Sequence, residues 1–143
     1  MIRPATAADI PELARLGKAW HAASHWPEFV PYDEGDLALT LGAILSSDDA
    51  FLLVSEKDGL CGAICVQFVR MYFNSRAKFA NEFFWFSNDP RLGLKLLREA
   101  ERVAFERGAA CFILGNQTND ERIAGIYTRL GYRPFSGNFV KGR

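Results

Sequence analysis

The sequence lacks the patterns that mark membrane proteins, exported proteins and general polyanion binders. No run of about 18 apolar residues occurs, which argues against a membrane span. The opening segment, MIRPATAADIPE, has no apolar signal-peptide core. Lys and Arg together number 17, as do Asp and Glu, so the formal net charge is zero, whereas nucleic-acid-binding domains usually carry a basic excess. We therefore expect a cytoplasmic protein that binds neither nucleic acid nor membrane.

Cysteine and histidine are also scarce. The three cysteines, Cys61, Cys65 and Cys111, show no Cys-x-x-Cys spacing, and the two histidines lie elsewhere in the chain. Structural zinc sites need four such ligands at characteristic spacings, so we expect no metal. Reduced thiols in the core of a cytoplasmic protein explain the cysteines better than ligation or disulfides.

What the sequence does contain is the composition of one globular domain and the element pattern of an α/β fold. The chain has 143 residues, of which 49% are hydrophobic and 24% charged, so we expect a single domain over residues 1–143. Apolar residues at helical spacing predict helices at about 6–22, 37–45, 90–107 and 118–131. Runs rich in β-formers predict strands at 2–4, 51–54, 60–72, 81–86 and 110–114, and a terminal hairpin over 132–141. The order is βααβββαβαββ, a central mixed β-sheet flanked by helices.

Two capping boxes mark the expected starts of the first and last helices. Thr6 precedes Asp9, and Thr118 precedes Glu121, by the three residues that this signal requires. We therefore expect these threonines to be the two N-cap residues.

The junction between the aromatic strand and the third helix is the most informative segment for function. It runs from Trp85 to Gly93, with Asp89 suited to the N-cap and Pro90 to the first helical position. Free N–H groups and the helix dipole attract anions at such a place, phosphate in particular. Three basic residues follow on the first turns: Arg91, Lys95 and Arg98. An ordinary strand-to-helix turn with a solvated basic face is the alternative.

Four segments, in order along the chain, match a known pattern. They are Ile2–Thr6 with Asp9, Gly59–Val66, Arg91–Gly108 and, most specifically, Ala124–Arg133 (Ala-Gly-Ile-Tyr-Thr-Arg-Leu-Gly-Tyr-Arg). Together they resemble the GNAT superfamily of N-acetyltransferases over essentially the whole chain. The resemblance implies acetyl-CoA as the donor and direct attack by an amine on its thioester. The family's phosphate loop reads Arg/Gln-x-x-Gly-x-Gly/Ala. In one alignment only Gly93 fits it here, and in a second, with a shorter loop, Arg91 takes the leading place; the middle Gly is missing in both.

The resemblance also implies catalytic and coenzyme-binding residues. An amine with a pKa near 10.4 is deprotonated only about once in 10³ at pH 7, so a general base helps. The family places a carboxylate where Glu82 lies and a general-acid tyrosine where Tyr127 lies. Coenzyme-binding residues are expected at Phe84, Trp85, Phe86, Arg91, Leu92, Gly93, Leu94, Lys95 and Asn116.

Each of these side chains also has a purely structural alternative. Glu82 could face solvent or pair with Arg76 or Lys78, and Tyr127 could be a core tyrosine whose hydroxyl merely finds a partner. Asn116 could only shape the turn after its strand.

The acceptor is expected at the loop that follows the first helix. Aromatic and imidazole groups, His25, Trp26, Phe29 and Tyr32, stand there beside acidic residues and would suit a cationic amine. The alternative is a solvated acidic loop that binds no acceptor. Two other functions stay open: a non-catalytic acyl-CoA-binding or regulatory module, and an interaction domain that binds no coenzyme. The edge of the terminal hairpin could also pair with a second copy, giving a homodimer.

Overall fold

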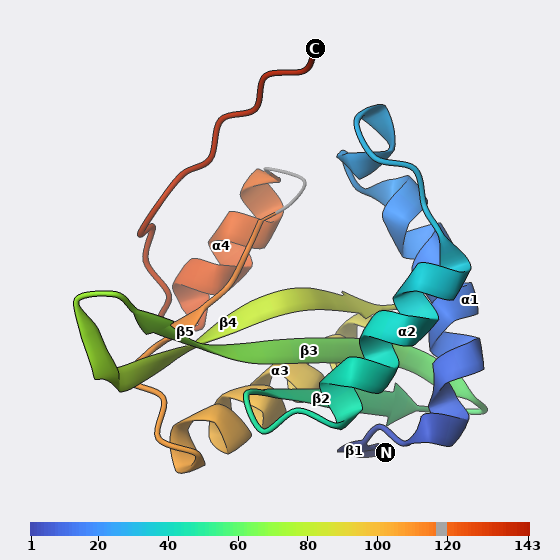
Figure 1. Ribbon diagram of the computed structural model, residues 1–143, viewed down its shortest axis with the longest axis horizontal. Helices are drawn as coiled ribbons and strands as arrows, with labels where there is room; N and C mark the ends of the chain where they lie inside the picture. Colours follow the sequence, from blue (N-terminus) through green and yellow to red (C-terminus); the bar gives the residue numbers. More distant parts are fainter. Residues whose placement is uncertain (117–119) are drawn as a thin grey trace.

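The protein is built around one mixed sheet, as the sequence predicts, but among the residues that the structure describes this sheet has five strands and not the expected seven. The computed structural model describes residues 1–116 and 120–143 (Figure 1). The strands, in sheet order, are β1 (Ile2–Pro4), β2 (Ala50–Glu56), β3 (Leu60–Met71), β4 (Asn74–Ser87) and β5 (Phe112–Ile113). All neighbouring pairs are antiparallel except β4 and β5, which are parallel. The parallel pair follows from the helix that connects these two strands.

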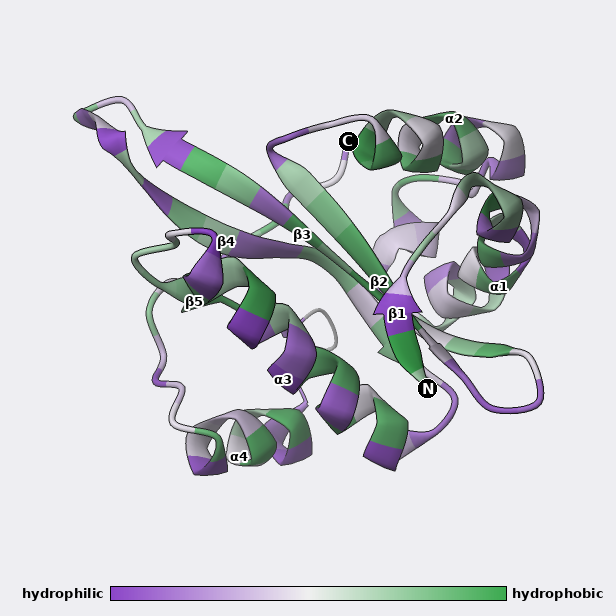
Figure 2. Ribbon diagram, turned by 90° about the horizontal axis from the view of Figure 1, so that it is seen from below, coloured by the Kyte–Doolittle hydropathy of each residue, from purple (hydrophilic) through white to green (hydrophobic). Residues whose placement is uncertain are grey.

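Helices cover both faces of this sheet. Helices α1 (Ile10–Ala23) and α2 (Glu34–Leu45) lie on one side, and α3 (Pro90–Glu106) and α4 (Glu121–Arg129) lie on the other (Figure 2). Each side has its own apolar core. Leu13 of α1 and Leu41 of α2 pack on one face, and the apolar stripe of α3 packs on the other, with Leu96 and Leu97 fully buried.

Strand β4 carries the features that position the candidate site. The register between β3 and β4 shifts at Cys65/Val66, which leaves Phe83 as an extra residue between the paired positions Glu82 and Phe84. On its other edge β4 pairs with β5 only at Ala80↔Phe112 and Asn81↔Ile113. Beyond these pairs β4 continues to Ser87 without β5, within the described part of the chain.

The predicted terminal hairpin over 132–141 is wrong. Residues 130–143 contain no strand, so the observed order is βααβββαβα. The side chains of Phe135, Phe139 and Val140 are at least 74% exposed, so little apolar burial offsets the entropy of ordering this segment. Pro134 supplies no N–H to a ladder. The hairpin edge expected to pair with a second copy is therefore not formed.

The two capping boxes have different outcomes. Thr6 and Asp9 form the predicted box, since the Asp9 carboxylate accepts bonds from both the N–H (2.7 Å) and the hydroxyl (3.0 Å) of Thr6. The box begins a 3₁₀ turn, Ala7–Asp9, directly before α1. Thr118 lies outside the described residues, and the N-cap of α4 is Asp120, whose carboxylate accepts a bond from the Arg122 N–H. No helix in the described ranges is both long and apolar enough to cross a membrane.

Candidate active site

Glu82 stands where β4 and β5 part. It directly follows Asn81, the last residue of β4 that pairs with β5, and its Oε2 accepts a bond from the Gly115 N–H at 3.0 Å. The side chain thus bridges the two chain segments where the backbone ladder stops. Removal from solvent raises the pKa of Glu82 to about 7, although the bond from Gly115 opposes the change. This carboxyl can therefore take up and release a proton near neutral pH.

The alternative partners of Glu82 are engaged elsewhere or exposed. No ion pair in the described ranges joins Glu82 to Arg76 or Lys78, and the Lys78 ammonium lies 4.5 Å from the centre of the Phe68 ring. Burial, with a contribution from the Glu82 charge, raises the pKa of the Cys65 thiol to about 12. Glu82 is therefore partly exposed without an ion pair to either basic side chain among the described residues, and Cys65 is an inert core thiol.

Tyr127 reaches the same residue from α4. Its hydroxyl donates to the Gly115 carbonyl at 2.9 Å, and its ring stacks on Trp85 with centroids 6.3 Å apart and planes 25° from parallel. Burial and, to a lesser degree, the Glu82 charge raise the pKa of Tyr127. The phenol consequently stays protonated at neutral pH, as a proton donor must. The same hydrogen bond to the Gly115 carbonyl would also be made by a purely structural core tyrosine.

Gly115 is the member of the site that the sequence did not reveal. Its N–H binds Glu82 and its carbonyl binds Tyr127, so one residue joins the proposed base and the proposed acid. The only available signal was its position as the first glycine after the predicted strand 110–114. Asn116 beside it exchanges bonds with the backbone of Asp120 at 3.0 and 3.2 Å, which is the turn-shaping role; its contact with a coenzyme stays a prediction.

The start of α3 is capped by its own chain. Asp89 Oδ1 accepts bonds from the N–H groups of Arg91 (2.9 Å) and Leu92 (3.2 Å), and Lys57 Nζ lies 3.3 Å from Oδ2. These bonds lower the pKa of Asp89, with the bond from Leu92 contributing most. The carboxylate therefore occupies the anion position that the sequence predicts at this helix end.

The aromatic residues of β4 divide between the two faces of the sheet. Phe84 and Phe86 face α1, where their ring centroids lie 5.7 and 5.9 Å from that of Trp20. Trp85 faces α3 and α4, between Gly93 and Tyr127. A small apolar cavity of about 20 Å³ lies on the α1 face, enough for one small group, lined by Leu13, Gly17, Trp20, Leu37, Leu41, Phe84 and Phe86.

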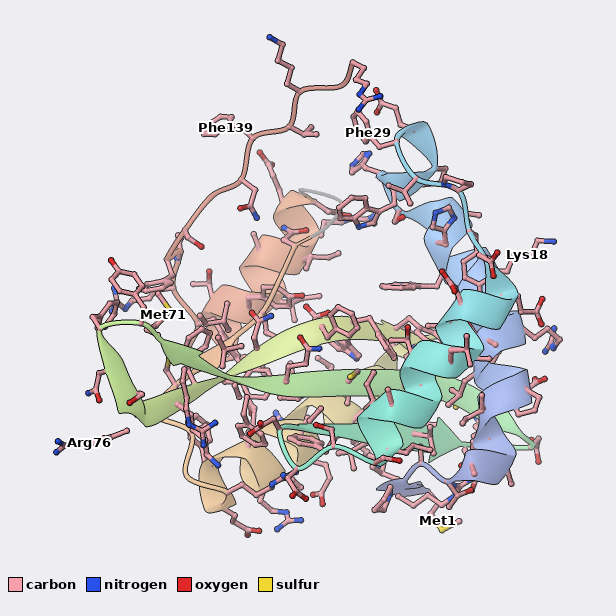
Figure 3. The ribbon with its side chains drawn as sticks, viewed as in Figure 1. Met1, Lys18, Phe29, Met71, Arg76 and Phe139 are labelled. Atoms are coloured by element: carbon pink, nitrogen blue, oxygen red, sulfur yellow. The ribbon has the colours of Figure 1, made fainter. Side chains whose placement is uncertain are left out.

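The loop expected to bind the acceptor has two exposed aromatic rings. Trp26 is 50% exposed and Phe29 is 39% exposed. Figure 3 shows Phe29 at the same end of the molecule as Phe139 of the C-terminal segment, and that segment reaches the loop at Gly142, where a Cβ would lie 3.1 Å from the Phe29 ring. Tyr32 is instead turned inward, where its hydroxyl donates to the Ala14 carbonyl.

The histidines do not form a metal pair. Helix α1 ends at Ala23, so His25 does not share a helical face with His21. His21 Nε2 lies 2.8 Å from the Val30 carbonyl oxygen. No group of three or more metal-ligating side chains occurs among the residues that the structure describes.

Comparison with known proteins identifies the fold. No family model matches the sequence, and no curated protein does. Solved structures match over almost the whole chain. A GNAT family acetyltransferase of Staphylococcus aureus is 20% identical (TM-score 0.65, covering 100% of this chain and 98% of that one). A predicted acetyltransferase of Clostridium acetobutylicum, solved with acetyl-CoA, is 13% identical (0.76, 99% and 95%). An aminoglycoside 6′-N-acetyltransferase of Acinetobacter haemolyticus is 12% identical (0.73, 100% and 97%). The chain therefore has the fold of the GNAT acetyltransferases.

Proposed function

We propose that this protein transfers an acetyl group from acetyl-CoA to a primary amine of a small molecule or peptide. The observation that carries this proposal is the placement of Glu82 and Tyr127 on either side of Gly115 where β4 and β5 part. Support comes from the fold, since one similar structure was solved with acetyl-CoA and another is an N-acetyltransferase.

In this proposal Glu82 is the general base. A pKa of about 7 makes its carboxylate a stronger base than an ordinary glutamate, and it matches a neutral working pH. It accepts a proton from the acceptor ammonium, directly or through water. The free amine then attacks the thioester carbonyl carbon, so that a C–N bond forms and the C–S bond breaks.

Tyr127 is the general acid in the same proposal. Its phenol, held neutral by burial, gives its proton to the departing thiolate and regains one from the nitrogen that becomes the amide. In the absence of the donor, the hydroxyl donates its hydrogen bond to the Gly115 carbonyl. This bond keeps the hydroxyl near the site until the thioester binds and its thiolate departs. The main chain at Phe84–Phe86 is proposed to donate an N–H to the thioester oxygen as it becomes negative.

The remaining predicted residues divide between the two substrates. Phe84, Trp85, Phe86 and Asn116 are proposed to lie along the thioester arm of the donor. The N–H groups of Arg91 and Leu92, expected from the sequence to bind its phosphates, bind the Asp89 carboxylate instead. On the acceptor side, the rings of Trp26 and Phe29 are available at the surface, and His25 lies between them and α1. The ring of Tyr32 is half-buried and contributes to the wall rather than through its hydroxyl.

A second candidate function is a non-catalytic acyl-CoA-binding module. It is favoured by the engagement of both Glu82 and Tyr127 with Gly115, because the same bonds would hold two purely structural side chains. Thiol release from acetyl-CoA across a panel of amines separates the two functions. An acetyltransferase releases free thiol with at least one amine and yields the acetylated amine by mass spectrometry. A binding module binds coenzyme A in calorimetry yet releases no thiol with any amine.

A further inference from the structure

The main-chain donors at the start of α3 are all used within the protein. This part of the chain is where the pyrophosphate of a coenzyme would have to bind, and such a site needs free N–H groups. The Asn88 N–H donates to the Cys61 carbonyl at 2.7 Å, and that of Asp89 to the Ser87 hydroxyl at 3.2 Å. Pro90 has no N–H. The donors of Arg91 and Leu92 bind the Asp89 carboxylate, and that of Gly93 binds the Asp89 carbonyl at 2.8 Å.

The Asp89 carboxylate also opposes a second anion at this position. Its lowered pKa keeps it ionised at neutral pH, and its Oδ2 is held by Lys57 at 3.3 Å. A pyrophosphate would have to displace it from both N–H groups and meet its negative charge at close range. The start of α3 therefore does not fit the pyrophosphate, whereas the residues around Gly115 do fit the thioester chemistry.

A donor without a partner lies between these two places. The indole Nε1 of Trp85 is buried and has no hydrogen-bond partner among the described residues. Its ring lies between Gly93 at the start of α3, 3.9 Å from where a Cβ would be, and Tyr127 of α4. Because an unpaired buried N–H is costly, a small turn of the half-buried ring that gives Nε1 an acceptor is favourable. The pantetheine arm of a coenzyme has amide carbonyls that can accept such a bond.

We propose that this protein recognises its acyl donor through the thioester and pantetheine arm, with Trp85 Nε1 as a hydrogen-bond donor, and not through the pyrophosphate. The substrate class is accordingly acyl-pantetheine thioesters, with or without the nucleotide of coenzyme A. This inference rests on the proposed acetyl transfer for its catalytic readout, but its binding readout is independent of turnover.

The test compares two donors that differ only beyond the pantetheine. Values of kcat/KM are measured with acetyl-CoA and with acetyl-pantetheine, and dissociation constants are measured by calorimetry for coenzyme A and pantetheine. The two kcat/KM values are expected to differ by less than tenfold, and so are the two dissociation constants. A larger preference for the nucleotide-bearing compound, or no binding of either thiol, overturns the proposal. If no amine supports turnover but the binding ratio stays within tenfold, the proposed acetyl transfer fails and the mode of recognition stands.

Variants of Asp89 and Trp85 test the two halves of the proposal. Asp89→Ala frees two N–H groups and should improve coenzyme A binding at least fivefold while pantetheine binding changes less than twofold. Asp89→Asn keeps an oxygen for the cap and should give a smaller gain, and it guards against loss of α3 in the alanine variant. Equal binding by wild type and both variants overturns the role of Asp89.

The indole N–H of Trp85 can be followed directly. The chain has three tryptophans, so ¹⁵N-labelled indole gives three N–H signals, and Trp85→Phe identifies one of them. Pantetheine should shift the Trp85 signal, and Trp85→Phe should weaken binding of both thiols equally, by at least fivefold. Tyr72→Phe, at a ring that is 95% exposed between β3 and β4, is the control, which should bind both thiols as the wild type does. An unmoved Trp85 signal at saturating pantetheine overturns the contact.

Discussion

Glu82 and Tyr127 bind the two polar main-chain groups of a single residue: Glu82 accepts the Gly115 N–H at 3.0 Å and Tyr127 donates to the Gly115 carbonyl at 2.9 Å. The two side chains come from β4 and α4, which are far apart in the sequence. The shared residue keeps a proton acceptor and a proton donor beside each other where β4 and β5 separate.

The partly desolvated carboxyl of Glu82 should make stability fall as pH rises. Its pKa is about 7 in the folded protein against an ordinary value of 4.5, so the folded state binds more protons between these two values. The free energy of unfolding should therefore decrease from about pH 4.5 to pH 7 relative to Glu82→Gln, by roughly 2–3 kcal/mol. Urea unfolding at several pH values measures this. The same pH dependence in wild type and Glu82→Gln would show that the carboxyl is not desolvated.

Tyr127→Phe should separate catalysis from packing. The ring and its stacking on Trp85 remain, so stability should fall by only about 1 kcal/mol, the scale of one lost hydrogen bond. Turnover should fall at least tenfold because the departing thiolate loses its proton donor. Tyr132→Phe is the matched control, since its hydroxyl donates to Glu101 and the side chain is also half-buried. If both variants keep turnover within twofold of wild type, Tyr127 is structural.

Two helical glycines should respond oppositely to alanine. At Gly17 of α1 a Cβ would lie 2.7 Å from Leu37 Cδ2 and 2.9 Å from the Tyr32 hydroxyl, so Gly17→Ala should destabilise the protein by about 1–3 kcal/mol. At Gly42 of α2 no atom lies within 4 Å of the added Cβ, so Gly42→Ala should stabilise it by about 0.5–1 kcal/mol. Thermal unfolding of both variants checks the close approach of α1 and α2. Equal shifts of the two melting temperatures would contradict that packing.

Local patterns in the sequence predicted the parts of the fold that depend on local physics. The strong apolar stripe and Asp89–Pro90 start of α3 placed that helix within a residue or two. The terminal hairpin failed because its β-formers, Phe139 and Val140 among them, find no surface to pack on. Intrinsic preference alone does not supply that surface.

From the sequence, the candidate site residues could be predicted only through the family resemblance. The resemblance implies roles for Glu82 and Tyr127, which stay predictions, but it does not point to Gly115, because the contacts of Gly115 with both side chains form only in the folded chain. Asp89 was predicted as an N-cap from the sequence. The sequence does not show that the Asp89 carboxylate binds the same N–H groups that were expected to bind phosphate. The hydrogen bonds of the folded chain show this.

The pH dependence of kcat/KM in wild type and Glu82→Gln tests the central claim most directly. If Glu82 is the base, the wild-type rate should rise with pH through an inflection near 7, because only the ionised carboxylate accepts the proton. Glu82→Gln should lack this inflection, be at least tenfold slower at pH 7.5, and recover toward the wild type at high pH, where the amine deprotonates by itself. A Glu82→Gln profile with the height and shape of the wild-type profile would contradict the account.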